Sequence, residues 1–151
     1  MDEVKISGTD DVTIILDRPR AINSLSGEML GAIGEAVKGS PRSIDLSGAG
    51  ERGYCSGADI RELRSLALKD PEAAGDWLDG EYDVDAAIAE VHSGTAHLQG
   101  ISMGGGLGLA LRLKRVEARD DLVLAMPETA IDLWAEVGAC VELSRAAGSC
   151  G

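Results

Sequence analysis

The residues with the clearest chemical potential are three consecutive glycines, Gly104 to Gly106, and a later glutamate, Glu128. The glycines lie between residues 95–99, which we predict to be extended, and residues 107–113, which we predict to be helical. Glycine permits close approach to the backbone, and the first amides of a helix have no partner inside it. Such amides, aligned with the helix dipole, stabilise a negatively charged oxygen. Donors of this kind together with a carboxylate suggest acyl chemistry.

A second glycine turn, at residues 53–60, precedes another predicted helix. Here Gly57 and Ala58 are followed by Asp59, which has with Glu62 the spacing of a capping box. Two convergent backbone N–H groups, those of Ala58 and Gly105, would form an oxyanion hole for a thioester or ester carbonyl. Each turn alone is more often structural than catalytic. Their combination with a positioned carboxylate favours the catalytic interpretation.

The elements that must position these turns alternate between strands and helices. A first helix should lie between an N-cap at Ser26 and a stop at Gly39, and a second should open at Asp59. Further helices are predicted at 82–91, 107–113 and 131–134, a polar break at 69–75, and strands at 11–16, 43–46, 95–99 and 122–126. This alternation indicates one α/β domain, residues 1–151, with mainly parallel strand pairing.

Composition excludes several functional classes. The formal net charge of −12 repels phosphates, so we expect neither nucleic acid nor an anionic membrane as a partner. No apolar run approaches the length of a membrane span, and the N-terminus lacks a signal-peptide pattern. The three cysteines form no CxxC motif, which favours a reduced, cytoplasmic setting. With only two histidines, we expect no metal site.

Several other polar residues favour structural interpretations. Cys55 lies beside the first glycine turn, but it reads as a small buried thiol rather than a nucleophile. Asp45 and His97 lie within otherwise apolar strands, where burial without a partner would be costly. The acidic residues between Asp76 and Asp85 predict a solvated helix face, with Glu81 as the exception.

Four ordered motifs together resemble the crotonase (enoyl-CoA hydratase/isomerase) superfamily. They are the segments 16–25, 53–60, 100–108 and 125–131. The resemblance implies the layered ββα (spiral) fold of that superfamily. Even its short members continue well past the position of Gly151, so we expect a C-terminally truncated domain. The missing helices would then come from a homo-oligomer or from a partner chain.

One branch, the 3-hydroxyisobutyryl-CoA hydrolases, is the most similar. Hydratases of the superfamily carry a glutamate where this chain has Gly108. In the hydrolase branch the catalytic carboxylate belongs to the Pro-Glu-Thr motif, here Glu128, and an aspartate eight residues later assists it. This chain has Glu136 at that spacing, and Glu81 before Tyr82 matches a substrate-contacting glutamate.

The resemblance also implies how an acyl-CoA substrate is held. The thioester oxygen would lie between Ala58 and Gly105, and the CoA portion would contact Arg20, Ala21 and Asp59. Coenzyme A then enters as part of the substrate, and no separate cofactor is expected. Two alternatives remain open: a hydratase- or isomerase-type lyase, and a catalytically dead remnant that binds CoA or a partner.

Overall fold

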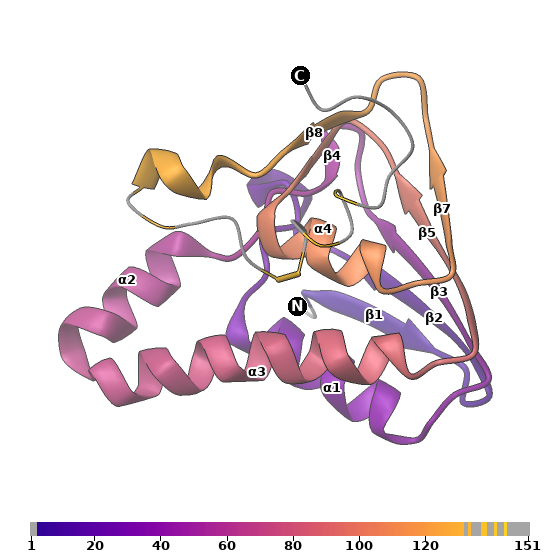
Figure 1. Cartoon of the computed structure of the whole chain (residues 1–151), viewed down its shortest axis with the longest axis horizontal. Helices are drawn as coiled ribbons and strands as arrows, with labels where there is room; N and C mark the ends of the chain where they lie inside the picture. Colours follow the sequence, from indigo (N-terminus) through magenta and orange to yellow (C-terminus); the bar gives the residue numbers. More distant parts are fainter. Residues whose placement is uncertain (1–2, 132, 134–136, 139–140, 142–143, 145–151) are drawn as a thin grey trace.

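The computed structural model describes residues 3–131, 133, 137, 138, 141 and 144, and the strands and helices alternate along them (Figure 1). The strands are β1 (Val4–Ser7), β2 (Asp11–Leu16), β3 (Ser43–Gly48), β4 (Gly53–Cys55), β5 (Ser93–Leu98), β6 (Ile101–Met103), β7 (Arg115–Ala118) and β8 (Val123–Ala125). The helices are α1 (Gly27–Lys38), α2 (Ile60–Lys69), α3 (Pro71–Ala89) and α4 (Gly104–Leu111), with 3-10 turns at Pro19–Ala21 and Pro127–Ile131. Within the described ranges, no helix combines the length and apolar character that crossing a membrane requires.

The strands form two sheets between which the chain passes repeatedly. The larger sheet has the order β1-β2-β3-β5-β7 and is parallel except for β1, and the smaller sheet, β4-β6-β8, is parallel throughout. Thus β3 leads to β4, β5 to β6 and β7 to β8, and each pair of strands is followed by a helix or helical turn. The prediction of an α/β domain with mainly parallel pairing is therefore confirmed.

Alternating burial in the larger sheet separates an inner from an outer face. In β2 the side chains of Val12, Ile14 and Leu16 are buried, whereas the intervening ones are not. The inner face packs against the helices, and α4 lies between α3 and the strands (Figure 1). The core is therefore built mainly from aliphatic side chains.

The outer face of this sheet holds Asp45 and His97, so the cost of burying a polar group inside an apolar strand does not arise for them. Nε2 of His97 lies 3.0 Å from Oδ2 of Asp45, and its Nδ1 lies 3.2 Å from Oε2 of Glu117. All three side chains are more than 40% exposed. The strand pattern has period two, and these residues occupy the solvated half of it.

The first two helices begin where their caps predict, although one cap differs in detail. The Ser26 hydroxyl accepts from the Met29 amide at the start of α1, and the carboxylate of Asp59 accepts from two amides at the start of α2. Glu62 does not complete a capping box, because the Asp59 amide donates to the carbonyl of Leu25. The Glu62 carboxylate instead accepts from the Gly27 amide at 3.2 Å and joins α2 to α1.

The predicted polar break at residues 69–75 is wrong, since Asp70 alone separates α2 from α3. Its Oδ1 caps α3 by accepting from the amides of Glu72 and Ala73, both at 3.1 Å. Pro71 opens α3 without loss, because a first-turn amide would have no partner inside the helix. The helix then runs to Ala89, longer than predicted. Asp85 is buried on it rather than solvated, which corrects the expectation of a wholly exposed acidic face.

The glycine triplet is the first turn of α4 rather than a loop before it. This turn approaches its neighbours closely: a Cβ on Gly106 would lie 2.4 Å from Sγ of Cys55. Four strands, β1, β4, β6 and β7, were not predicted. They are only three or four residues long, too short for a periodic pattern to identify them, and every residue of β7 is exposed.

The contact at Gly106 predicts opposite effects of alanine at two helical glycines. Gly106→Ala should lower the free energy of unfolding by about 1–3 kcal/mol, because the new methyl group overlaps the Cys55 side chain. Gly31→Ala in α1 is the matched control, since nothing lies within 4 Å of a Cβ there. It should raise stability by about 0.4–1 kcal/mol. Urea unfolding measures both, and equal effects would contradict the packing described here.

Candidate active site

A cavity of about 240 Å³ lies where the two glycine turns meet. The two predicted oxyanion residues, Ala58 and Gly105, both line it, together with the carboxylate residues Glu81 and Glu128. Apolar side chains of α2 and α3 form much of the remaining wall: Ile60, Leu63 and Leu78. The structure thus brings four of the predicted site residues, from four separate segments of the chain, to one cavity.

The two predicted donors belong to backbone segments that touch. Gly57 has a φ of +94°, and a Cβ built on it would lie 3.3 Å from the Met103 carbonyl oxygen and 3.5 Å from the Gly105 nitrogen. The β-bridge that fixes this turn consists of two hydrogen bonds to Leu25, one at the Gly57 carbonyl and one at the Asp59 amide. The Ala58 N–H takes no part in this bridge. Gly105 is the second residue of α4, where an amide has no acceptor inside the helix. Both N–H groups thus belong to segments suited to donate to a ligand.

The two carboxylates occupy space that only glycine leaves free. A Cβ on Gly105 would lie 1.8 Å from Oε1 of Glu81, and one on Gly104 would lie 3.0 Å from Oε1 of Glu128. Gly104 also has a φ of +52°, which disfavours any other residue. Glu81 is 1% and Glu128 8% exposed. Among the described residues, Oε2 of Glu128 is buried and has no hydrogen-bond partner. A buried acceptor of this kind is costly, and it is suited to receive a ligand or water.

Gly108, at the hydratase glutamate position, lies outside this cavity and has no room for a side chain. A Cβ there would lie 2.7 Å from Cβ of Val137 and 3.0 Å from Oδ2 of Asp85. Burial raises the pKa of Asp85 to about 7, although the charge of Arg112 opposes the shift. Asp85 is thus a buried acid behind the cavity that sequence reasoning assigned to solvent. Helical periodicity could have indicated its burial, since it follows the buried Glu81 by one turn.

Two further residues complete the account of predicted chemistry. Burial raises the pKa of the Cys55 thiol to about 12, so it stays protonated, as expected of a structural cysteine. Glu136, the predicted assistant of Glu128, lies outside the described residues, and its role stays a prediction. Within the described part of the chain, no group of three His, Cys, Asp or Glu side chains is arranged to hold a metal ion.

A larger open cavity of about 720 Å³ adjoins the first and shares Ala58 with it. The residues predicted to contact CoA, Arg20, Ala21 and Asp59, all line this cavity. Sequence reasoning missed two other arginines here, Arg18 and Arg61. The sequence offered one signal, because Arg18 and Arg61 each lie two residues from a predicted CoA contact, Arg20 and Asp59 respectively.

Comparison with known proteins places this arrangement in a family. The sequence model described as enoyl-CoA hydratase/isomerase matches residues 12–151. The chain belongs to the enoyl-CoA hydratase/isomerase family. A carnitinyl-CoA dehydratase crystal structure from Mycobacterium thermoresistibile superimposes with a TM-score of 0.90 at 32% identity, over 98% of this chain and 46% of that one. The predicted crotonase-like fold is therefore confirmed.

The relatives of this family member include proteins of different kinds. A mitochondrial 3-hydroxyisobutyryl-CoA hydrolase from Gallus gallus is 35% identical over 144 residues, which cover 91% of this chain and 37% of the hydrolase. The small ribosomal subunit protein mS47 of Neurospora crassa is 33% identical over 148 residues, 92% of this chain and 29% of that protein. The chain thus spans well under half the length of these relatives. The predictions of a cytoplasmic location and of a homo-oligomer or partner chain stay predictions.

The burial of Asp85 predicts a pH dependence of stability. Since the pKa of Asp85 is raised in the folded state, protonation of this side chain stabilises the fold. This stabilisation is fully present below the ordinary pKa of 3.8 and is lost as pH rises through about 7. In this window the stability of the wild type should fall by roughly 1.4 kcal/mol per pH unit relative to Asp85→Asn.

Urea unfolding at pH 5, 6, 7 and 8 measures this difference. Asp83→Asn, an exposed aspartate of the same helix, is the matched control and should keep the wild-type pH profile. Parallel profiles for Asp85→Asn and the wild type would contradict the assignment.

Proposed function

We propose that this protein is an acyl-CoA thioester hydrolase that resembles 3-hydroxyisobutyryl-CoA hydrolase. The observation that carries the proposal is the meeting of Ala58, Gly105 and Glu128 around one cavity. Backbone donors can stabilise the negative oxygen of a tetrahedral intermediate, and a carboxylate beside them can attack or activate water. The similarity to the Gallus gallus hydrolase supports the same reaction class.

In the proposed reaction the thioester carbonyl oxygen accepts hydrogen bonds from the N–H groups of Ala58 and Gly105. Glu128 then attacks the carbonyl carbon as nucleophile or takes a proton from an attacking water molecule. The C–S bond breaks, and CoA leaves as a thiol after gaining a proton. In the nucleophilic route water then cleaves the anhydride between the acyl group and Glu128, and in both routes the acyl group leaves as a carboxylic acid. The donors become stronger partners as the oxygen gains charge, which lowers the barrier.

Glu81 is proposed to recognise the acyl group rather than to react. Its Oε1 lies against Gly105, so it is close to the carbonyl that the Gly105 amide would hold. A hydroxyl group on the acyl chain would donate to this carboxylate. Glu136 would assist by orienting water or transferring a proton.

The CoA portion is proposed to lie in the larger cavity beside the acyl site. Guanidinium groups bind phosphate through charge-assisted hydrogen bonds, and Arg20 and Arg61 line this cavity. Ala21 and Asp59 would contact the same portion of the substrate. Since CoA is part of the substrate, no further cofactor is needed.

A hydratase- or isomerase-type reaction is the less favoured alternative. The carboxylate that hydratases place at the position of Gly108 is missing, and Val137 and Asp85 fill the space it would need. A non-catalytic role is the second alternative, and it draws support from the similarity to mS47. The two alternatives differ from the proposal in what Glu128 does.

Substitution of the proposed catalyst is the direct test. Glu128→Gln should reduce the release of free CoA from 3-hydroxyisobutyryl-CoA by at least about a hundredfold, because the amide is neither a base nor a nucleophile. Thiol release, measured with a chromogenic disulfide, reports turnover. Glu35→Gln, on the exposed surface of α1, is the control and should leave the rate unchanged. Equal rates for Glu128→Gln and the wild type would contradict the proposal.

Binding of CoA can be tested without turnover. Saturation at 100 times the dissociation constant should stabilise the chain by about 2.7 kcal/mol in a thermal-shift measurement. Arg20→Met should weaken CoA binding about tenfold by removing a charge-assisted contact. Arg115→Met, on the edge strand β7, is the matched control. If both variants bound CoA as the wild type does, Arg20 would lie outside the site.

A further inference from the structure

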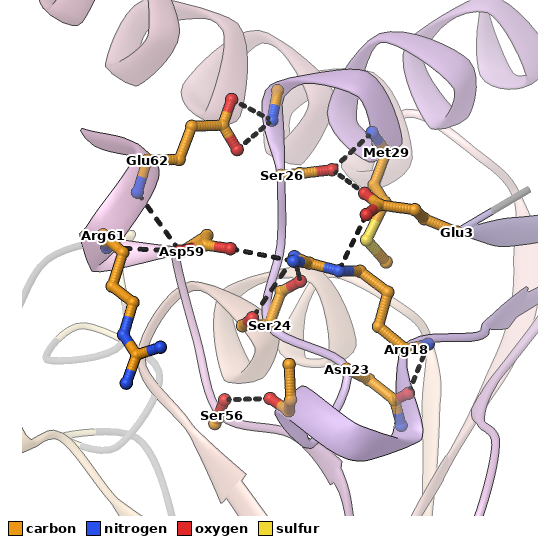
Figure 2. A network of polar contacts seen from close by, with 12 residues as sticks. Glu3, Arg18, Asn23, Ser24, Ser26, Met29, Ser56, Asp59, Arg61 and Glu62 are labelled. Atoms are coloured by element: carbon orange, nitrogen blue, oxygen red, sulfur yellow. Dashed lines mark hydrogen bonds and ion pairs between the residues drawn. The ribbon is translucent and has the colours of Figure 1, made fainter. Parts of the chain in front are cut away.

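A polar network joins the loop after β2 to Asp59, the residue that follows Ala58 (Figure 2). At its centre is Arg18, whose Nη2 donates to Oδ2 of Asp59 at 3.0 Å and whose Nε pairs with Oε1 of Glu3 at 3.0 Å. Its Nη1 donates to the carbonyl oxygen of Ser24 at 2.8 Å. The guanidinium group therefore has partners on three sides, which fix its orientation.

Asp59 is held at both carboxylate oxygens. While Oδ2 accepts from Arg18, Oδ1 accepts from the amides of Arg61 at 3.1 Å and Glu62 at 3.2 Å. Burial alone would raise the pKa of Asp59, but the hydrogen bonds from Glu62 and Arg18 outweigh it and lower the pKa below its usual value. The side chains of Arg18 and Asp59 are 21% and 17% exposed, so solvent screens this pair less than a surface pair.

Main-chain bonds connect the same two segments. The Leu25 amide donates to the Gly57 carbonyl at 2.8 Å, and the Asp59 amide donates to the Leu25 carbonyl at 2.7 Å. These bonds fix the residues on either side of Ala58 and leave its own N–H out. Small rotations of the 57–59 turn would therefore change the direction of this N–H.

The segment that supplies Arg18 adopts an unusual backbone conformation. Ile22 and Asn23 have φ values of +49° and +52°, in the left-handed region that β-branched residues avoid. Such a conformation persists where surrounding contacts over-determine it, and it is common at functional sites. Here the Asn23 side chain accepts from the Arg18 amide at 2.9 Å and donates to the Tyr54 carbonyl at 2.9 Å. The loop after β2 is thereby joined to β4.

We propose that Arg18 is a positioning residue, which through Asp59 sets the direction in which the Ala58 N–H donates to the substrate carbonyl. The inference rests on the proposed function, because the direction of this N–H matters only if a thioester is bound there. A donor acts on the transition state only when it is aimed at the developing charge. Loss of this Arg18–Asp59 clamp through Arg18→Lys should therefore reduce kcat and leave KM nearly unchanged, whereas Asp59→Asn should also raise KM, because Asp59 is proposed to contact CoA.

Two substitutions weaken the clamp while they keep the fold. Arg18→Lys retains the charge but loses the planar fork, and Asp59→Asn retains an N-cap for α2 but loses the charged partner. Each should lower kcat about ten- to a hundredfold, since a misaligned group costs this much. Melting temperatures identify any variant that fails to fold.

Each variant has a matched control elsewhere in the chain. Arg42 also pairs with an aspartate, Asp11, but both side chains are exposed, so Arg42→Lys should keep kcat. Asp70 caps α3 through the same two amide positions but has no arginine partner among the described residues, so Asp70→Asn should keep kcat as well. A rise in KM at constant kcat for Arg18→Lys would overturn the proposal, because Arg18 would then act by binding the ligand directly.

A second readout does not depend on turnover. In the Glu128→Gln background, the infrared carbonyl band of bound isobutyryl-CoA, labelled with ¹³C at the thioester carbon, reports how strongly the N–H donors polarise the carbonyl. We expect this band at lower wavenumber than for the free ligand, and Arg18→Lys and Asp59→Asn should return it toward the free value. If the ligand band shifts on binding but both variants leave it in place, the role of Arg18 is wrong and the oxyanion site stands. If binding causes no shift, the proposed oxyanion site is wrong, and the role of Arg18 fails with it.

Discussion

The close approach of α4 to its neighbours is the constraint on which the rest of the structure depends. A Cβ built on its first three residues would lie 3.0 Å from Oε1 of Glu128, 1.8 Å from Oε1 of Glu81 and 2.4 Å from Sγ of Cys55, in that order. Any larger residue would push these groups apart, because interiors are close-packed and the overlap would fall on buried atoms. The helix therefore starts at a point where its free amides and two acidic side chains share one small cavity.

The groups that suit this cavity for chemistry also lower the stability of the fold. Buried carboxylates and unpaired amides are each unfavourable, and natural proteins keep such groups together mainly where a ligand uses them. The acidic side chains would be stabilised by the dipole of α4, which points its positive end into the cavity.

Because the chain follows a spiral path, the site is built from several segments that are far apart in the sequence. Each turn of the spiral brings the end of a smaller-sheet strand, β4, β6 or β8, to the same edge, where the Ala58 turn, the start of α4 and the Glu128 turn follow. The segment that contains Arg18 and Asn23 then holds the first of these turns from outside. Ligand-binding groups at the carboxyl ends of parallel strands are a general consequence of α/β topology.

The sequence by itself determined the strand–helix alternation, the caps at Ser26 and Asp59 and the two glycine turns, and it singled out Glu128 as the candidate carboxylate. These features depend on the spacing of residue types along the chain, which can be read directly from the sequence. Only the tertiary structure decided that Asp45 and His97 face solvent and that Asp70 alone separates α2 from α3. It also decided that Arg18 clamps Asp59 across 41 positions of sequence. Burial and long-range pairing depend on which segments meet in space, and the spacing of residues along the chain does not contain that information.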